Sequence, residues 1–203
     1  MDDRGMLIVL SGPSGVGKGT VLKAFLKAHP QFRSSISATT RAPREGERNG
    51  VNYYFYSQEE FYQLVSEGGM LEYAIYNGNC YGTPKRFVEE ALQRGEDVIL
   101  EIEVKGAAQV RAACPDACFI FIIPPDFHQL AERLRGRGTE DAEAIVKRLA
   151  AAKDELLRAS QYDYIIVNDR VEAAADRLYT VIEAARYASK NQKHLIDEVL
   201  KDA

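Results

Sequence analysis

The sequence has few cysteines and histidines, and their spacing argues against the common disulfide and zinc frameworks. The cysteines are odd in number and form no C-x-x-C pair: Cys80, Cys114 and Cys118. We expect reduced thiols in a cytoplasmic protein rather than a disulfide-stapled one. The three histidines share no metal-ligand spacing, so the sequence gives no support to a structural zinc site.

The chain also lacks a basic excess, a long apolar run and an export signal. Its formal net charge is −4, whereas domains that bind nucleic acid usually carry a surplus of Lys and Arg. No stretch approaches the roughly 18 apolar residues of a membrane helix, and residues 1–5 lead directly into an apolar run. We therefore expect no nucleic-acid partner and no membrane partner. The oligomeric state is left open.

A glycine-rich segment follows the first apolar run of this 203-residue chain. Residues 7–10 read Leu-Ile-Val-Leu, and residues 12–20 read Gly-Pro-Ser-Gly-Val-Gly-Lys-Gly-Thr. This order predicts a buried strand, a phosphate-binding loop and a helix over residues 20–28. Glycines let successive N–H groups point at one anion, Lys18 adds a positive charge, and the helix dipole favours phosphate at its N-terminus.

The loop departs from the G-x-x-x-x-G-K-[ST] template at one position. Gly19 stands where the template has a hydroxyl residue, and Thr20 follows one place later. We expect a mononucleotide or phosphate site, with a plain glycine-rich turn as the alternative. Whether Thr20 contacts a metal ion directly or through water is left open.

Residues 34–84 are predicted to form a small β-rich lobe inserted between core units. The segment holds a hydroxyl-rich stretch, an aromatic run at 52–56, a helix over 57–65 with a Ser57–Glu60 capping box, and a strand over 70–76 that turns at 77–79. It also holds three arginines within eight residues: Arg41, Arg44 and Arg48. Their planar guanidinium groups suit phosphate binding, and a solvated charged loop is the alternative.

The rest of the chain alternates between helices and strands, which is typical of an α/β fold with a mostly parallel sheet. Glu101 and Glu103 are expected near the carboxyl end of one strand, where open α/β sheets bind ligands. The predicted helices cover residues 84–94, 127–135, 142–160 and 171–189, and the predicted strands cover residues 97–104, 117–123 and 164–167.

Arginines gather around a glycine-rich connection between two of these helices. Residues 135–139 read Arg-Gly-Arg-Gly-Thr, and Arg148 follows on the helix that Thr139 is expected to cap. A mobile lid that carries arginines can neutralise a transferring phosphate and exclude water. A surface helical hairpin is the alternative.

Seven motifs in this order resemble the guanylate kinase family and span about residues 5 to 187. They are Gly-Pro-Ser-Gly-Val-Gly-Lys-Gly-Thr at 12–20, Ser-Ala-Thr-Thr-Arg-Ala-Pro-Arg at 37–44, Gly-Glu-Arg-Asn-Gly-Val-Asn-Tyr at 46–53, Tyr-Gly-Thr at 81–83, Glu-Ile-Glu-Val at 101–104, Arg-Gly-Arg-Gly-Thr at 135–139 and Val-Asn-Asp at 167–169.

The resemblance implies a cytoplasmic enzyme of purine metabolism that converts ATP and GMP to ADP and GDP with Mg²⁺, and that also accepts dGMP. It implies a P-loop core over residues 1–33, 85–126 and 158–203, a GMP-binding lobe over 34–84 and a helical lid over 127–157. A scaffold module that binds phosphorylated peptides and a P-loop kinase for another monophosphate or a phosphorylated sugar are the alternatives.

The same resemblance implies a role for each matching residue. ATP would be held by Gly12, Pro13, Ser14, Gly15, Val16, Gly17, Lys18, Gly19, Thr20 and Asn168, with Thr20 at the metal. GMP would be held by Ser37, Arg41, Arg44, Tyr53, Glu72, Tyr81, Thr83 and Glu101. Phosphoryl transfer would be assisted by Lys18, Arg41, Arg137 and Arg148.

Within the implied GMP site, Ser37, Glu72 and Thr83 match the positions that read guanine. A carboxylate accepts hydrogen bonds from N1–H and the exocyclic amine of guanine, and hydroxyls donate to O6. Adenine reverses this pattern, so Glu72 is expected to reject AMP. Many family members have Asp at the position of Glu101, which leaves the role of this longer side chain open.

Overall fold

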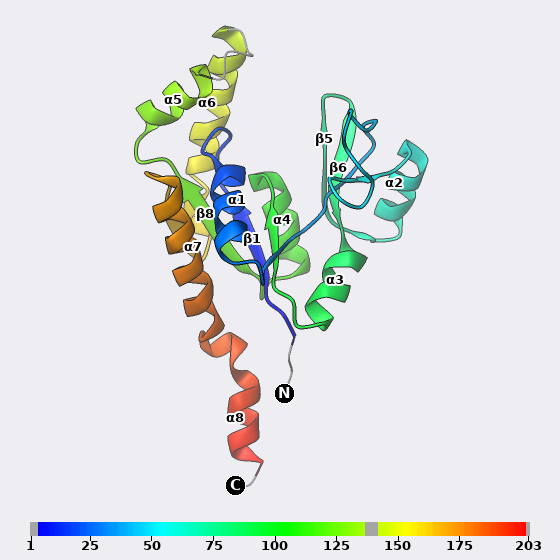
Figure 1. Cartoon of the computed structure of the whole chain (residues 1–203), viewed down its shortest axis with the longest axis vertical. Helices are drawn as coiled ribbons and strands as arrows, with labels where there is room; N and C mark the ends of the chain where they lie inside the picture. The colour runs from blue at the N-terminus through cyan, green and yellow to red at the C-terminus, as the bar shows by residue number, and fades with distance from the viewer. Residues whose placement is uncertain (1–3, 137–141, 202–203) are drawn as a thin grey trace.

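The computed structural model describes residues 4–136 and 142–201, which form two sheets and the helices around them (Figure 1). Strands of the larger sheet are all paired in parallel. Their spatial order is β2 (Arg33–Ser34), β7 (Val98–Glu101), β1 (Leu7–Ser11), β8 (Cys118–Ile123) and β9 (Tyr164–Val167). The predicted α/β fold with a mostly parallel sheet flanked by helices is therefore confirmed.

Helices cover both faces of this sheet, and β1 is buried between them. Ile8 and Leu10 join one apolar cluster, and Leu7 and Val9 join the other. Alternate residues of a strand point to opposite faces, so a strand buried on both sides needs the uninterrupted apolar run that the sequence has. The first cluster includes side chains of α1 (Lys18–Ala28) and α7 (Val171–Arg186), and the second includes side chains of α3 (Lys85–Gln93) and α4 (Val104–Ala113).

The smaller sheet lies beside α4, on the side away from α7 (Figure 1). Its order is β4 (Tyr54–Phe55), β3 (Ala38–Thr39), β6 (Asn79–Pro84) and β5 (Met70–Tyr76), and α2 (Gln58–Ser66) packs on it. The predicted capping box of Ser57 and Glu60 is present at the start of α2. Asn77 and Gly78, with φ of 47° and 75°, make the predicted tight turn between β5 and β6.

One predicted strand is shorter than expected. The strand predicted over 97–104 ends at Glu101, and α4 begins at Val104 with Glu103 as its N-cap. Val104, Ala107 and Val110 are buried at a spacing of three, which is helical periodicity and competes with the strand reading. Glu103 therefore lies at a helix N-terminus, where a carboxylate is favoured by the dipole.

The helices after β8 also differ from the expected bounds. The long helix predicted over 142–160 is α6 (Ala142–Leu156) followed by a short 3₁₀ turn, η1 (Ala159–Gln161). Thr139, its predicted cap, lies outside the described residues. The predicted helix over 127–135 is present as α5 (Phe127–Arg135).

The final predicted helix ends at Arg186 instead of Ser189. It is followed by η2 (Ser189–Asn191) and α8 (Lys193–Leu200), which extends away from both sheets toward the C-terminus (Figure 1). In the described part of the chain, none of the helices has the length and apolar character to cross a membrane.

Candidate active site

The glycine-rich loop joins the carboxyl end of β1 to the N-terminus of α1. Gly17 is the N-cap of α1 and has φ of 94°, in the left-handed region that favours glycine. A Cβ added to Gly17 would also lie 2.8 Å from Nδ2 of Asn168. Backbone conformation and space therefore both require glycine at the point where the loop enters the helix.

Lys18 turns its ammonium back into this loop. Its Nζ donates to the carbonyl oxygen of Gly12 at 2.7 Å and lies 3.4 Å from that of Pro13. It also lies 3.8 Å from Oε1 of Glu103. Lys18 is 8% exposed, so the loop encloses a positive charge that an anionic ligand can approach.

Glu101, at the end of β7, lies against Gly19, the position at which the loop departs from its template. The Oε1 atom of Glu101 lies 3.1 Å from the place where a Cβ on Gly19 would be. A serine or threonine at position 19 would therefore crowd the carboxylate. Burial raises the pKa of Glu101, the nearby charge of Lys18 lowers it, and Glu103 raises it.

Oxygen donors beside the loop fit a hydrated Mg²⁺ ion. Thr20 is exposed and follows Gly19 in the sequence, and the carboxylate of Glu101 lies against Gly19. Mg²⁺ takes one or two carboxylates together with substrate phosphates and water. Thr20 and Glu101 are thus of the right chemistry for a magnesium–nucleotide complex.

Asn168, the residue after β9, holds the glycine-rich loop through a hydrogen bond to its backbone. Its Nδ2 donates to the carbonyl oxygen of Val16 at 2.8 Å, and the side chain is buried. Arg133 of α5 donates to the same carbonyl at 3.2 Å and to the carbonyl of Asn168 at 3.0 Å. Arg133 therefore spans the loop and the strand end, a role that the sequence reasoning did not anticipate.

Helix α6 reaches the top of the loop at Ser14. Arg148 donates from Nη2 to the Ser14 hydroxyl at 2.7 Å. Glu155, which the sequence analysis did not single out, accepts a hydrogen bond of 3.2 Å from the Ser14 N–H. The predicted phosphate residue Arg148 is thus brought to the loop, whereas Arg137 lies outside the described residues.

A second group of predicted residues gathers around Arg41, beyond β3. Nη2 of Arg41 lies 2.9 Å from both carboxylate oxygens of Glu47, and the guanidinium lies 5.4 Å from the Tyr53 ring centroid. The rings of Tyr53 and Tyr81 are 6.2 Å apart. The N–H of Arg44 donates to Glu47 at 2.8 Å, and this bond and Arg41 lower the pKa of Glu47.

Glu47 was missed by the sequence reasoning. The only local signal is its position three residues after Arg44 in a turn, where the Glu47 N–H also bonds to the Arg44 carbonyl. Glu47 holds the side chain of Arg41 and the backbone of Arg44 together. The two predicted phosphate-binding residues are therefore pre-arranged by one carboxylate.

Glu72 of β5 and Thr83 of β6 form a third, buried group. The Thr83 hydroxyl donates to Oε1 of Glu72 at 2.7 Å. Gly106 of α4 faces the same carboxylate, because a Cβ there would lie 2.6 Å from Oε2 of Glu72. Burial raises the pKa of Glu72 and the bond from Thr83 lowers it. Ser37 lies just before β3 and is half-buried.

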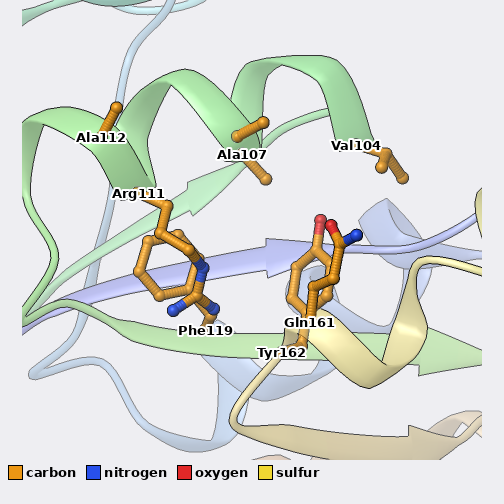
Figure 2. A pocket seen from close by; sticks show the side chains of 8 residues that line it. Val104, Ala107, Arg111, Ala112, Phe119, Gln161 and Tyr162 are labelled. Atoms are coloured by element: carbon orange, nitrogen blue, oxygen red, sulfur yellow. The ribbon is translucent and has the colours of Figure 1, made fainter.

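A separate hollow of about 300 Å³ lies between α4 and η1. Figure 2 shows Arg111 descending from α4 over the ring of Phe119, beside Tyr162 and Gln161. The Arg111 guanidinium carbon lies 3.7 Å from the Phe119 ring centroid, a cation–π geometry. None of the predicted site residues lines this hollow, so it is distinct from the groups described above.

Comparison with known proteins decides the family to which this arrangement belongs. The family model described as guanylate kinase matches residues 4–185. The chain belongs to the guanylate kinase family. It is 55% identical over 188 residues to the guanylate kinase of Streptococcus pneumoniae (strain R6), covering 92% of this chain and 90% of that protein.

Two further guanylate kinases extend the comparison. The chain is 50% identical over 203 residues to that of Lactococcus lactis subsp. lactis, covering 98% and 99% of the two chains. The crystal structure of guanylate kinase from Anaplasma phagocytophilum matches with a TM-score of 0.71 and 34% identity, over 92% of this chain and 88% of that one. The predicted family is confirmed, while the roles of individual residues stay predictions.

Proposed function

We propose that this protein transfers the γ-phosphoryl group of ATP to GMP, giving ADP and GDP, and so acts in purine nucleotide metabolism. Family membership supports the reaction. The observation in the fold that carries the choice of acceptor is the buried pair of Glu72 and Thr83, joined by a 2.7 Å hydrogen bond. A carboxylate is expensive to bury without a partner, so its place in the smaller sheet calls for a ligand that donates hydrogen bonds.

Guanine has the donors that this pair requires. Its N1–H and exocyclic amine both donate to a carboxylate, and its O6 accepts from a hydroxyl such as that of Ser37, or that of Thr83 once its single proton is turned away from Glu72. Adenine presents an acceptor at N1, which would face the Glu72 carboxylate without donating a hydrogen bond to it. A site built to hydrogen-bond one ligand discriminates strongly against an analogue that leaves its buried groups unpaired.

The phosphate of GMP is assigned to the group around Arg41. Arg44, Tyr53 and Tyr81 supply a guanidinium and two hydroxyls, and Arg41 adds a second guanidinium that can reach between acceptor and donor. Guanidinium forks bind phosphate through two parallel hydrogen bonds. These contacts involve the base and the phosphate, which is consistent with dGMP as a second acceptor.

The donor is assigned to the glycine-rich loop. The backbone N–H groups of the loop between Gly12 and Thr20, apart from Pro13, which has none, and the ammonium of Lys18 would hold the phosphates of ATP, and Asn168 would contact the adenine. Thr20 and Glu101 would hold Mg²⁺, which supplies neutralisation of the donor's phosphate charge. Arg137 and Arg148 would neutralise the transferring group.

This scheme needs no covalent protein intermediate. Phosphoryl transfer is assisted mainly by positioning and by charge neutralisation. The residues assigned here orient two nucleotides and exclude water; none of them acts as a nucleophile.

The test is an ADP-release assay with ATP and Mg²⁺ that compares GMP, dGMP, AMP, CMP and UMP as acceptors. Turnover with GMP and dGMP, and little with the others, is the expected result. Turnover with another monophosphate or a phosphorylated sugar instead would assign a different P-loop kinase. If the folded protein turns over none of these acceptors, the kinase proposal is wrong, and a role as a scaffold module that binds phosphorylated peptides takes its place.

A second measurement addresses the base directly. Glu72→Gln should raise the KM for GMP and relax the preference for GMP over AMP, because the amide presents a donor where guanine also donates. Glu59→Gln, an exposed change on α2, is the matched control and should leave both unchanged. Equal loss of GMP and AMP turnover in Glu72→Gln would contradict the assigned role.

A further inference from the structure

Two side chains of α6 hold Ser14 from opposite ends of the residue. Oε2 of Glu155 accepts from the Ser14 N–H at 3.2 Å, and Nη2 of Arg148 donates to the Ser14 hydroxyl at 2.7 Å. Arg148 and Glu155 are seven residues apart, which places them two turns apart on one face of the helix. The helix is thus joined to the loop by one basic and one acidic contact at the same residue.

The acidic contact is unusual for a loop that binds anions. A backbone N–H of such a loop is a donor for phosphate oxygen, yet here a carboxylate takes it. Glu155 is half-buried, and burial raises the pKa of its carboxyl group. The Ser14 N–H and the charges of Lys18 and Lys105 lower that pKa, and Glu103 raises it.

A phosphate that enters the loop has to share this region with two carboxylates. Glu103 lies 3.8 Å from the Lys18 ammonium, and Glu155 occupies the amide of Ser14. Two anions cannot both accept from one N–H without strong repulsion at such short range. The incoming phosphate has further loop amides and Lys18 as partners, so it can replace Glu155 but not bind beside it at Ser14.

We propose that Glu155 is a displaceable phosphate mimic: its carboxylate occupies the Ser14 amide in the nucleotide-free protein, and the phosphates of the donor nucleotide take this place when they bind. The inference rests on the proposed use of the loop for ATP. In this proposal Glu155 opposes binding of the donor nucleotide. Its contact with Ser14 also holds α6 to the loop until the nucleotide binds. The apparent affinity for the donor nucleotide is then the intrinsic affinity multiplied by the fraction of molecules in which Glu155 has left Ser14.

Removing the mimic should therefore tighten donor binding. Glu155→Gln keeps the size of the side chain but removes the charge, and Glu155→Asp keeps the charge but withdraws it from Ser14 by one methylene. A hydrogen bond to a charged group is worth enough to change affinity by about tenfold. We expect Glu155→Gln to bind ATP and inorganic triphosphate about tenfold more tightly than the wild type, and Glu155→Asp to show a smaller gain.

The experiment is titration calorimetry of the full chain with ATP, with inorganic triphosphate and with adenosine, each with Mg²⁺. Adenosine has no phosphate to compete with Glu155, so its affinity should be the same in all variants. A purely structural loosening of the site would change adenosine binding as well. Asp154→Asn, an exposed neighbour on α6, is the matched control and should bind every ligand as the wild type does.

Each outcome decides the inference separately from the proposed function. The proposed role of Glu155 is wrong if Glu155→Gln binds ATP no more tightly than the wild type. It is also wrong if Glu155→Gln binds adenosine more tightly. Should Glu155→Gln fail to fold, Glu155→Asp carries the same comparison. Because these titrations contain no acceptor, a wild type that fails to phosphorylate GMP overturns the proposed function and leaves this result standing.

Discussion

The Thr83 hydroxyl donates a 2.7 Å hydrogen bond to Oε1 of Glu72, across two strands of the smaller sheet. Thr83 is fully buried and Glu72 is 7% exposed. Burial raises the pKa of Glu72, and the hydrogen bonds from the hydroxyl and the backbone of Thr83, which lower that pKa, do not offset the effect of burial. A ligand that donates further hydrogen bonds to Glu72 would offset this cost of burial.

Neutralising Glu72 should stabilise the nucleotide-free protein at pH 7. An acid whose pKa is raised in the folded state contributes stability that is present below its ordinary pKa and lost as the pH rises through the folded pKa. Glu72→Gln removes that loss while its amide oxygen still accepts from Thr83. We expect a Tm increase of a few degrees at pH 7, since about 1 kcal/mol moves Tm by about 2–4 °C in a domain of this size.

Scanning calorimetry at pH 4 and pH 7 checks this prediction. The increase should shrink at pH 4, where the wild-type carboxyl is largely protonated in both folded and unfolded protein. Glu59→Gln, on the exposed face of α2, should change Tm at neither pH. A lower Tm of Glu72→Gln at pH 7 would show that Thr83 already satisfies the carboxylate.

Local features, such as helix caps and tight turns, could be predicted from the sequence. The capping box of Ser57 and Glu60 and the Asn77–Gly78 turn were predicted correctly, because each is decided within a few residues. The phosphate-binding loop was predicted on the same basis, from a short motif that includes Gly17 and Lys18. The strand predicted through residue 104 was wrong after Glu101, because the alternating Glu-Ile-Glu-Val at 101–104 also fits the helical spacing of Val104, Ala107 and Val110.

Contacts between distant segments could not be predicted this way. Glu155 lies 141 residues from Ser14, and nothing near it distinguishes it from other acids on an Ala-rich helix. Gly106 looks like an ordinary helix residue until the fold brings Glu72 against it. Such pairings are made by the packing of α4 and α6 on other elements, which local patterns do not encode.

Gly106→Ala should weaken GMP binding without unfolding the protein. The added methyl would lie 2.6 Å from Oε2 of Glu72, so the carboxylate has to shift from its present position. Alanine favours the helix by up to about 1 kcal/mol over glycine, so α4 itself is not harmed. We expect the KM for GMP to rise about tenfold or more, the cost of a lost hydrogen bond to a charged group, with the KM for ATP unchanged.

A double-mutant cycle checks the physical cause. Glu72→Asp shortens the acid by one methylene and makes room for the methyl group. The effects of Gly106→Ala and Glu72→Asp on the KM for GMP should therefore be less than additive when combined. Additive effects would mean that Gly106 acts elsewhere than on the Glu72 carboxylate.

The cysteines should differ in reactivity in the native protein. Burial, with the charge of Asp163, raises the pKa of Cys118 to about 12, so only about one molecule in 10,000 is a thiolate at pH 8. Cys80 is 2% exposed. Cys114 is half-buried, and its pKa is also raised by burial. We expect Ellman's reagent to modify at most Cys114 slowly at pH 8, and all three thiols in denaturant; fast modification of Cys118 would contradict its burial.

Removing the support beneath the loop should affect the donor more than the acceptor. Asn168 and Arg133 both donate to the Val16 carbonyl, and Arg133 uses its second nitrogen on the Asn168 carbonyl. Asn168→Ala removes one buried hydrogen bond, worth about 1 kcal/mol, and should lower Tm by about 2–4 °C. Arg133→Lys keeps the charge but cannot span two carbonyls, because its ammonium is a single point.

Steady-state kinetics with ATP and GMP varied in turn test this support. Each variant should raise the KM for ATP several-fold and leave the KM for GMP near the wild-type value, because Val16 lies in the glycine-rich loop proposed to bind ATP and not in the smaller sheet. The two changes share one carbonyl, so their combined effect should depart from additivity. Arg86→Lys, at an exposed arginine on α3, is the control, and an equal rise in both KM values would show that the loop support acts on the whole fold.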